Sequence, residues 1–150
     1  MNRYFSDTPL NFDEARVGDK LTPLTKYPNE VDVVRFCAAI RNFHRFHYDQ
    51  DFTAKQGIKQ LLIPGFLIGN WCIEATSRAF GPGTEIASLK FRNTSMAPVA
   101  EDYLVAGEVT AVSEGAPKTI TCSLEVTRQA TGETVTTGRV AIRPAKAANR

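Results

Sequence analysis

The feature that most constrains the fold of this chain is the apolar segment IPGFLIGNWCIEATSRAF, which runs from Ile63 to Phe80. At 3.6 residues per turn it makes about five helical turns. Its large apolar side chains cover much of the helix circumference instead of one stripe, which is typical of a buried helix. Gly81-Pro82-Gly83 follows, where proline cannot continue the hydrogen-bond ladder and glycine accepts a left-handed turn. We therefore predict one largely buried helix from Ile63 to about Arg78.

The rest of the chain after this helix predicts antiparallel strands. Residues Lys118 to Arg128 alternate between polar and apolar side chains, as a strand with one packed and one solvated face does. Further strands are expected over Glu85 to Phe91, Tyr103 to Val112 and Glu133 to Ile142. In the last of these the apolar phase slips, and the simple explanation is a bulge at Gly138. The expected fold class is α+β, with about four strands in a curved antiparallel sheet wrapped around the long helix.

Length and composition bound the remaining possibilities. A chain of 150 residues that is 43% hydrophobic is the size of one ordinary domain and can bury a continuous core, so we expect a single domain over residues 1–150. The 18 Lys and Arg residues exceed the 16 Asp and Glu residues only slightly and are scattered along the chain. No basic stripe predicts a nucleic-acid partner.

Cysteine usage and hydropathy indicate the compartment. Cys37, Cys72 and Cys122 are odd in number, far apart and flanked by apolar residues, which is typical of reduced thiols in a core. The opening MNRYFSDTPLNF lacks the basic-then-apolar order of a signal peptide. The most apolar stretch, Leu61 to Ile73, is too short and too interrupted to span a bilayer. A soluble cytoplasmic protein without a membrane partner is expected.

A second helix and a polar loop precede the long helix. Asn29 can cap a helix with Asp32 at its third position, and the apolar spacing of VDVVRFCAAI predicts that this helix ends near Arg41. The next stretch, RNFHRFHYDQDF, has no clean period and is rich in side chains that titrate or form hydrogen bonds. It is expected to be a loop and to carry chemistry.

The segment FCAAIRNFHRFHYDQDFTAKQGIKQLLIPGFLIGNW is similar to the hydratase signature of the MaoC-like hydratase/dehydratase family. In that signature a short helix leads to an acidic residue, then a histidine five positions later and an aspartate two positions beyond. Asn42, His47 and Asp49 stand at these places. The resemblance covers most of the chain, and the pattern Asn-x-His-Arg-x-His-Tyr-Asp is most similar to the hydroxyacyl-thioester dehydratase branch. The same span also resembles the smaller subunits of bacterial steroid side-chain hydratases.

The resemblance implies a hotdog fold, acyl thioesters of coenzyme A or acyl carrier protein as substrates, and a homodimer or a heteromer with a related subunit. Pro64, Gly65 and Phe66 stand where the family commonly has His-Gly-Met, and the glycine amide helps to bind the thioester oxygen. These three residues and Asp49 are therefore expected to bind substrate. The chain departs from the family at Asn42, because the usual catalytic pair there is aspartate and histidine.

The same residues can be interpreted without the resemblance. Hydration of an enoyl thioester needs a base for water, a proton for the α carbon and a charge sink for the enolate oxygen; it needs no cofactor and no metal. His47 titrates near neutral pH and can act as base and proton carrier. Asn42 can orient water but cannot exchange a proton. The Gly65 amide, at the start of a buried helix, favours negative charge.

Several alternatives stay open from the sequence. His44 and His47 are spaced as metal ligands, but no third ligand is evident. Asp49 can cap or orient the loop, and Phe66 and Trp71 suit a core better than a ligand platform. The chain can be a catalytically weak or silent subunit that binds acyl thioester in a heteromeric hydratase. A hotdog thioesterase is the third hypothesis, with Glu74 as the one candidate carboxylate on the long helix.

Overall fold

The computed structural model describes residues 9–113 and 115–145. Five strands form one sheet in the order β1-β3-β4-β5-β2, and every neighbouring pair is antiparallel. In chain order the elements are β1 (Leu24–Lys26), α1 (Glu30–Ile40), a 3-10 turn η1 (Arg45–His47), α2 (Gln50–Lys55), α3 (Gly65–Phe80), β2 (Thr84–Asn93), β3 (Tyr103–Ser113), β4 (Thr119–Arg128) and β5 (Glu133–Pro144). The four predicted strands are confirmed to within two residues at each end, whereas the three-residue β1 was not predicted.

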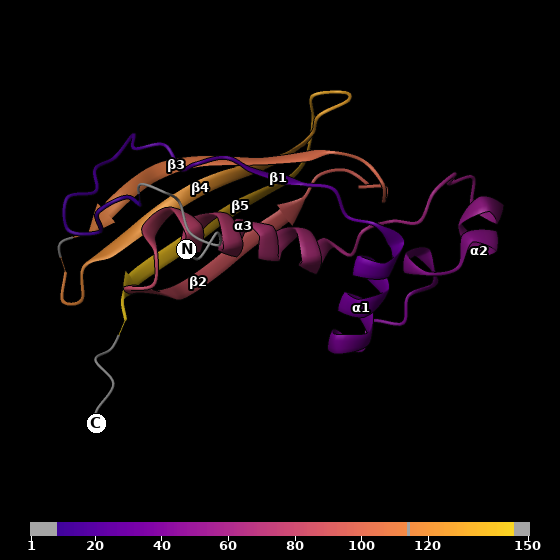
Figure 1. The fold of residues 1–150 in the computed structure, drawn as a ribbon, viewed down its shortest axis with the longest axis horizontal. Helices are drawn as coiled ribbons and strands as arrows, with labels where there is room; N and C mark the ends of the chain where they lie inside the picture. The colour runs from indigo at the N-terminus through magenta and orange to yellow at the C-terminus, as the bar shows by residue number, and fades with distance from the viewer. Residues whose placement is uncertain (1–8, 114, 146–150) are drawn as a thin grey trace.

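Helix α3 lies across one face of the curved sheet, and α1 and α2 lie beyond one end of the sheet (Figure 1). The prediction of a largely buried central helix is confirmed, with Trp71 only 4% exposed and Cys72 fully buried. The helix begins two residues later than predicted, because Pro64 is its N-cap and the Ile63 amide donates to the Ala97 carbonyl at 2.8 Å.

Two details of packing differ from the sequence-based expectation. The alternative that placed Phe66 in the core is wrong: its side chain is 66% exposed, because the first turn of α3 projects where the sheet ends (Figure 1). The bulge is not at Gly138: the register shift against β4 leaves Val135 as the extra residue of β5, and Val135 and Thr136 are consecutively buried. Gly138 pairs regularly with Leu124, and its missing side chain accommodates Cys72, whose Sγ would lie 2.7 Å from a Cβ there.

The segment before α3 is more regular than expected. The capping box of α1 is present, with the Asn29 side chain accepting from the Asp32 amide at 3.0 Å, and the helix ends at Arg41 in the left-handed region with φ 56°. The following stretch was predicted as a loop, but it contains η1 and the six-residue α2. Asp49 is the N-cap of α2 and stabilises it. A helix of six residues is too short for hydrophobic periodicity to predict it.

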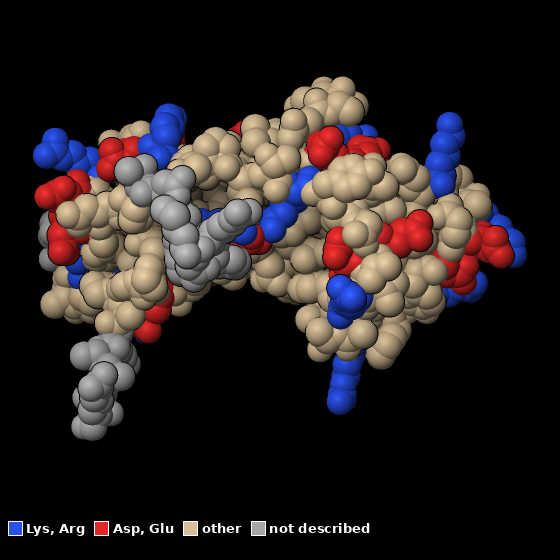
Figure 2. Space-filling model, in the orientation of Figure 1, with Lys and Arg blue, Asp and Glu red and all other residues tan. Residues whose placement is uncertain are grey.

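The surface and the thiols agree with the composition. Basic and acidic side chains are interspersed on the face seen in Figure 2, with no continuous basic stripe. Cys37, Cys72 and Cys122 are free and buried, as predicted, and burial raises the pKa of Cys72 to about 11 and that of Cys122 to about 12. Among the described residues no helix is long and apolar enough to cross a membrane.

Candidate active site

His47 lies in η1, next to the segment that leads into α3. Its Nδ1 lies 2.8 Å from the carbonyl oxygen of Leu62, and the Leu62 amide donates to the Phe46 carbonyl at 2.9 Å. These two bonds hold the imidazole against Leu62, which is three residues before Gly65, the first residue of α3. His47 and the start of α3, which are eighteen residues apart in the signature, are therefore held near each other.

The hydrogen bond determines which ring nitrogen of His47 is reactive. A carbonyl oxygen can only accept, so Nδ1 carries the hydrogen and Nε2 keeps its lone pair in the neutral ring. Burial lowers the pKa of His47 below its usual 6.5, the positive charge of nearby His44 lowers it further, and the bond to Leu62 opposes both effects. The two rings are 5.9 Å apart. At neutral pH the imidazole is thus available as a base.

This pKa gives a testable pH dependence. If neutral His47 is the base, kcat/KM should be constant near neutral pH and fall on acidification, with a midpoint below pH 6.5. Replacing His44 by glutamine removes a charge that lowers the pKa of His47, so the midpoint should move to higher pH. Rates measured from pH 5 to pH 8 for both proteins check this. A midpoint above pH 6.5 in the wild type would contradict the assignment.

Asn42 directly follows the left-handed Arg41 that ends α1. Its Oδ1 accepts from the His44 amide at 3.2 Å, so the carbonyl end of the side chain is part of the turn that leads to η1. The amide end of Asn42 is the part that is able to orient a water molecule. A carboxylate at this position would keep the same acceptor, so the turn is compatible with aspartate as well.

Asp49 has a clear structural task. Its Oδ1 accepts from the Phe52 amide at 2.9 Å, and its Oδ2 accepts from Arg45 Nε and Nη2 at 2.9 and 2.7 Å. These hydrogen bonds and the Arg45 charge hold the pKa of Asp49 below its usual value. The carboxylate thus caps α2 and connects it to η1. This confirms the alternative, given from the sequence, that Asp49 caps or orients this segment. Its expected contact with substrate stays a prediction.

The first turn of α3 carries the remaining expected residues. Pro64 is buried, and the amides of Leu67 and Ile68 both donate to its carbonyl. The amides of Gly65 and Phe66 make no hydrogen bond within the part of the chain that the structure describes. The exposed Phe66 ring packs edge-on against Phe91 of β2, with 5.5 Å between centroids. The turn therefore offers unpaired donors beside an accessible aromatic surface.

Glu74 is a poor candidate for a thioesterase base. Its carboxylate pairs with Lys26 Nζ at 2.5 Å and with Arg78 Nη2 at 2.9 Å, and its side chain is only 18% exposed. It is also nine residues from Gly65, about 13 Å along the helix. A carboxylate held by two cations at that distance from the helix start stabilises the contact of β1 with α3 and is not positioned to activate water at Gly65.

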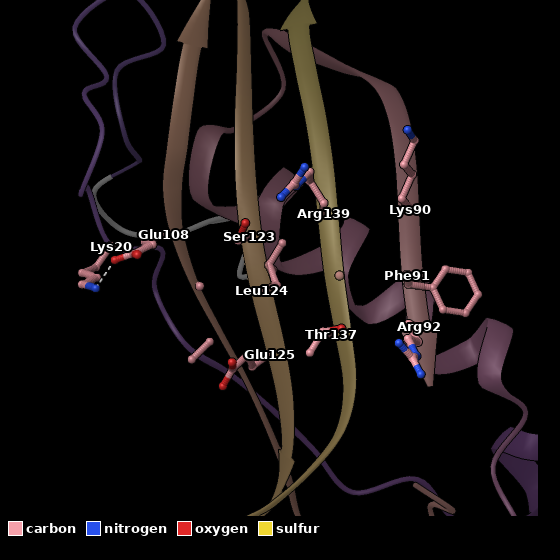
Figure 3. A pocket seen from close by; sticks show the side chains of 13 residues that line it. Lys20, Lys90, Phe91, Arg92, Glu108, Ser123, Leu124, Glu125, Thr137 and Arg139 are labelled. Atoms are coloured by element: carbon pink, nitrogen blue, oxygen red, sulfur yellow. Dashed lines mark hydrogen bonds and ion pairs between the residues drawn. The ribbon is translucent and has the colours of Figure 1, made fainter. Parts of the chain in front are cut away.

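In the part of the chain that the structure describes, neither a metal cluster nor the hollow on the outer face of the sheet involves the expected site residues. Among the described residues no group of three or more His, Cys, Asp and Glu side chains is arranged to hold a metal ion. A hollow of about 720 Å³ lies on the sheet face opposite to α3, with Lys90 and Arg139 on its surface (Figure 3). None of the residues that line it is an expected site residue.

Comparison with known proteins identifies the family of this chain and structures that share its fold. The model of the family "hydroxyacyl-thioester dehydratase type 2" matches residues 11–100, more than half of the chain, including η1 and the start of α3. No curated protein matches significantly. The fold is similar to that of the (R)-hydratase from A. caviae involved in PHA biosynthesis, at 21% identity over 88% of this chain and 98% of that one, with a TM-score of 0.81.

Two other solved structures share the fold. The R-hydratase PhaJ1 from Pseudomonas aeruginosa is 24% identical over 93% of this chain and 88% of its own, with a TM-score of 0.82. A chain of the ChsH1-ChsH2 complex from Mycobacterium tuberculosis is 24% identical over 87% of this chain and 98% of its own, with a TM-score of 0.77.

The fold is the hotdog fold, which this chain shares with solved R-hydratases and with a structure described as a MaoC-like dehydratase. The chain belongs to the hydroxyacyl-thioester dehydratase type 2 family. Its family and fold point to hydratase/dehydratase activity, as the resemblance in the sequence predicted.

Proposed function

We propose that this chain is an enoyl-thioester hydratase, or in reverse a 3-hydroxyacyl-thioester dehydratase, in which His47 is the base. The observation that carries the proposal is the hydrogen bond from His47 Nδ1 to the Leu62 carbonyl, which leaves Nε2 free close to the start of α3. The substrate is a 2-enoyl thioester of coenzyme A or of acyl carrier protein, and the product is the R-hydroxyacyl thioester if the stereochemistry of the family applies.

The proposed reaction needs only groups of this chain. Water, oriented by the Asn42 amide, loses a proton to His47 Nε2 as its oxygen bonds to C3 of the enoyl group. The electron pair of the double bond moves toward the thioester oxygen, which becomes an enolate that accepts a hydrogen bond from the Gly65 amide. The enolate then collapses as C2 takes the proton back from the imidazolium. Pro64, Phe66 and Asp49 are proposed to line or support the substrate site.

We further propose that the working protein is a homodimer or a heteromer with a related hotdog subunit. Strand β2 pairs with β5 on one side, and its ten residues form an edge of the described sheet. An open edge of this length presents unpaired backbone groups that favour addition of another strand. Gly65 and Phe66 contact the side chains of β2, so a second subunit on this edge would lie beside the site.

Substitutions of Asn42 help to distinguish an active enzyme from a silent subunit. Asn42→Asp keeps the acceptor for the His44 amide, and its negative charge should raise the pKa of His47 and shift the acid limb of kcat/KM to higher pH. We expect this variant to keep or exceed the wild-type hydration rate at pH 8. Asn42→Ala, which removes both the acceptor and the donor, should be slower than both.

The decisive assay is the initial rate of water addition to crotonyl-CoA and longer enoyl-CoAs by the isolated protein. A wild-type rate that depends on His47 supports the proposal. No rate in wild type, Asn42→Asp or His47→Ala would contradict it in favour of the second hypothesis, a silent subunit. In that case activity should appear only with a partner chain that supplies its own aspartate and histidine.

A further inference from the structure

Asn93 is the last residue of β2 and lies against the first residue of α3. A Cβ built on Gly65 would lie 2.0 Å from Asn93 Nδ2, far inside any normal contact distance. Because Gly65 has no side chain, the carboxamide of Asn93 can lie next to the start of the helix. The sequence did not indicate Asn93 as a site residue, because Gly65, against which it lies, is nearly thirty residues away along the chain.

The orientation of this carboxamide is fixed from the core. Thr136 is fully buried, and its Oγ1 donates to Asn93 Oδ1 at 2.8 Å. Because the oxygen of the carboxamide is held by this bond, the Nδ2 end must turn toward Gly65. Nδ2 makes no hydrogen bond to any other residue that the structure describes, although Asn93 is exposed to incoming ligand.

We propose that Asn93 Nδ2 is a second hydrogen-bond donor, beside the Gly65 amide, for the thioester oxygen of the substrate, and that Thr136 is the positioning residue that aims it. The inference rests on the proposed function. Two preorganised donors stabilise the charge of an enolate oxygen more than one, and a donor held in advance costs no reorganisation during the reaction. A fully buried threonine hydroxyl that orients an exposed asparagine is the arrangement that such preorganisation requires.

The first test is steady-state hydration of crotonyl-CoA. Asn93→Ala removes the donor and should lower kcat about 100- to 1,000-fold, with a much smaller change in KM, since the bond strengthens as charge develops. Asn93→Asp, which replaces the donor by a charged acceptor, should be at least as slow. Gly65→Ala should resemble Asn93→Ala, because the new methyl group displaces the Asn93 side chain.

The role of Thr136 has its own set of variants. Thr136→Val is expected to lower kcat about two- to tenfold, the effect of one lost neutral hydrogen bond, and Thr136→Ser, which keeps the hydroxyl, should restore the rate. The matched control is Thr76→Val on α3, which also removes a fully buried hydroxyl, bonded at 2.9 Å to the Cys72 carbonyl. It should lower stability to a similar degree without the loss of kcat.

A second readout does not depend on hydration. Bound acetoacetyl-CoA should be held as its enolate at neutral pH, with the enolate's ultraviolet absorbance, and Asn93→Ala should bind the compound without that absorbance. If wild type hydrates nothing but shows the Asn93-dependent absorbance, the inference stands and the proposed function fails. If wild type hydrates crotonyl-CoA and Asn93→Ala equals it in both readouts, the inference fails alone. No enolate signal and no hydration in wild type overturns both.

Discussion

Replacing His47 by alanine is expected to lower the hydration rate of an enoyl-CoA by about two to four orders of magnitude, the loss typical of a general acid-base group. The variant loses the only proton carrier in the proposed reaction, because the Asn42 amide neither accepts nor releases a proton under these conditions. The loss should appear in kcat and in kcat/KM to a similar degree, since proton transfer occurs in the transition state. Initial rates under saturating and limiting substrate provide the measurement.

The matched control is His44→Ala, which removes an imidazole three residues away that does not contact the Leu62 carbonyl. Its ring stacks on Phe46 with 5.0 Å between centroids, so a small loss of local packing is expected, together with a higher pKa of His47. The rate at pH 8 should stay within a few-fold of wild type. A robust wild-type rate that is unaffected in His47→Ala would contradict the site assignment.

Trp71→Ala should destabilise the folded protein by about 3 to 5 kcal/mol, the cost of deleting a large buried aromatic side chain. Trp71 is 4% exposed in the middle of α3, and its ring packs against Tyr103 of β3 with 5.7 Å between centroids. Its removal leaves a cavity between the helix and the sheet that the backbone cannot close. Urea unfolding at one fixed protein concentration measures the change, because the proposed association with a second subunit would make stability depend on concentration.

Phe66→Ala is the control on the same helix. The side chain is 66% exposed, so the free energy of unfolding should change by much less than in Trp71→Ala. Any effect of this variant is expected on acyl-thioester binding or on association instead. A cost below about 1 kcal/mol for Trp71→Ala would mean that α3 does not hold the core as described.

The sequence by itself determined the elements whose signals are local. Helical periodicity and the Asn29 and Asp32 capping box predicted α1 and its end at Arg41, and alternation predicted four strands to within two residues. The buried position of α3 followed from its apolar circumference. The spacing of Asn42 and His47 indicated the family, because the signature lies within one continuous segment.

Only the tertiary structure decided how those residues work together. The reactive nitrogen of His47 depends on the Leu62 carbonyl, and the close approach of Asn93 to Gly65 depends on β2 running back along α3. The position of the bulge at Val135 depends on the pairing with β4, and the exposure of Phe66 depends on where the sheet ends. The physical reason is common to all four: each is set by packing between segments distant in sequence, whereas periodicity and capping report only on neighbours within a few turns.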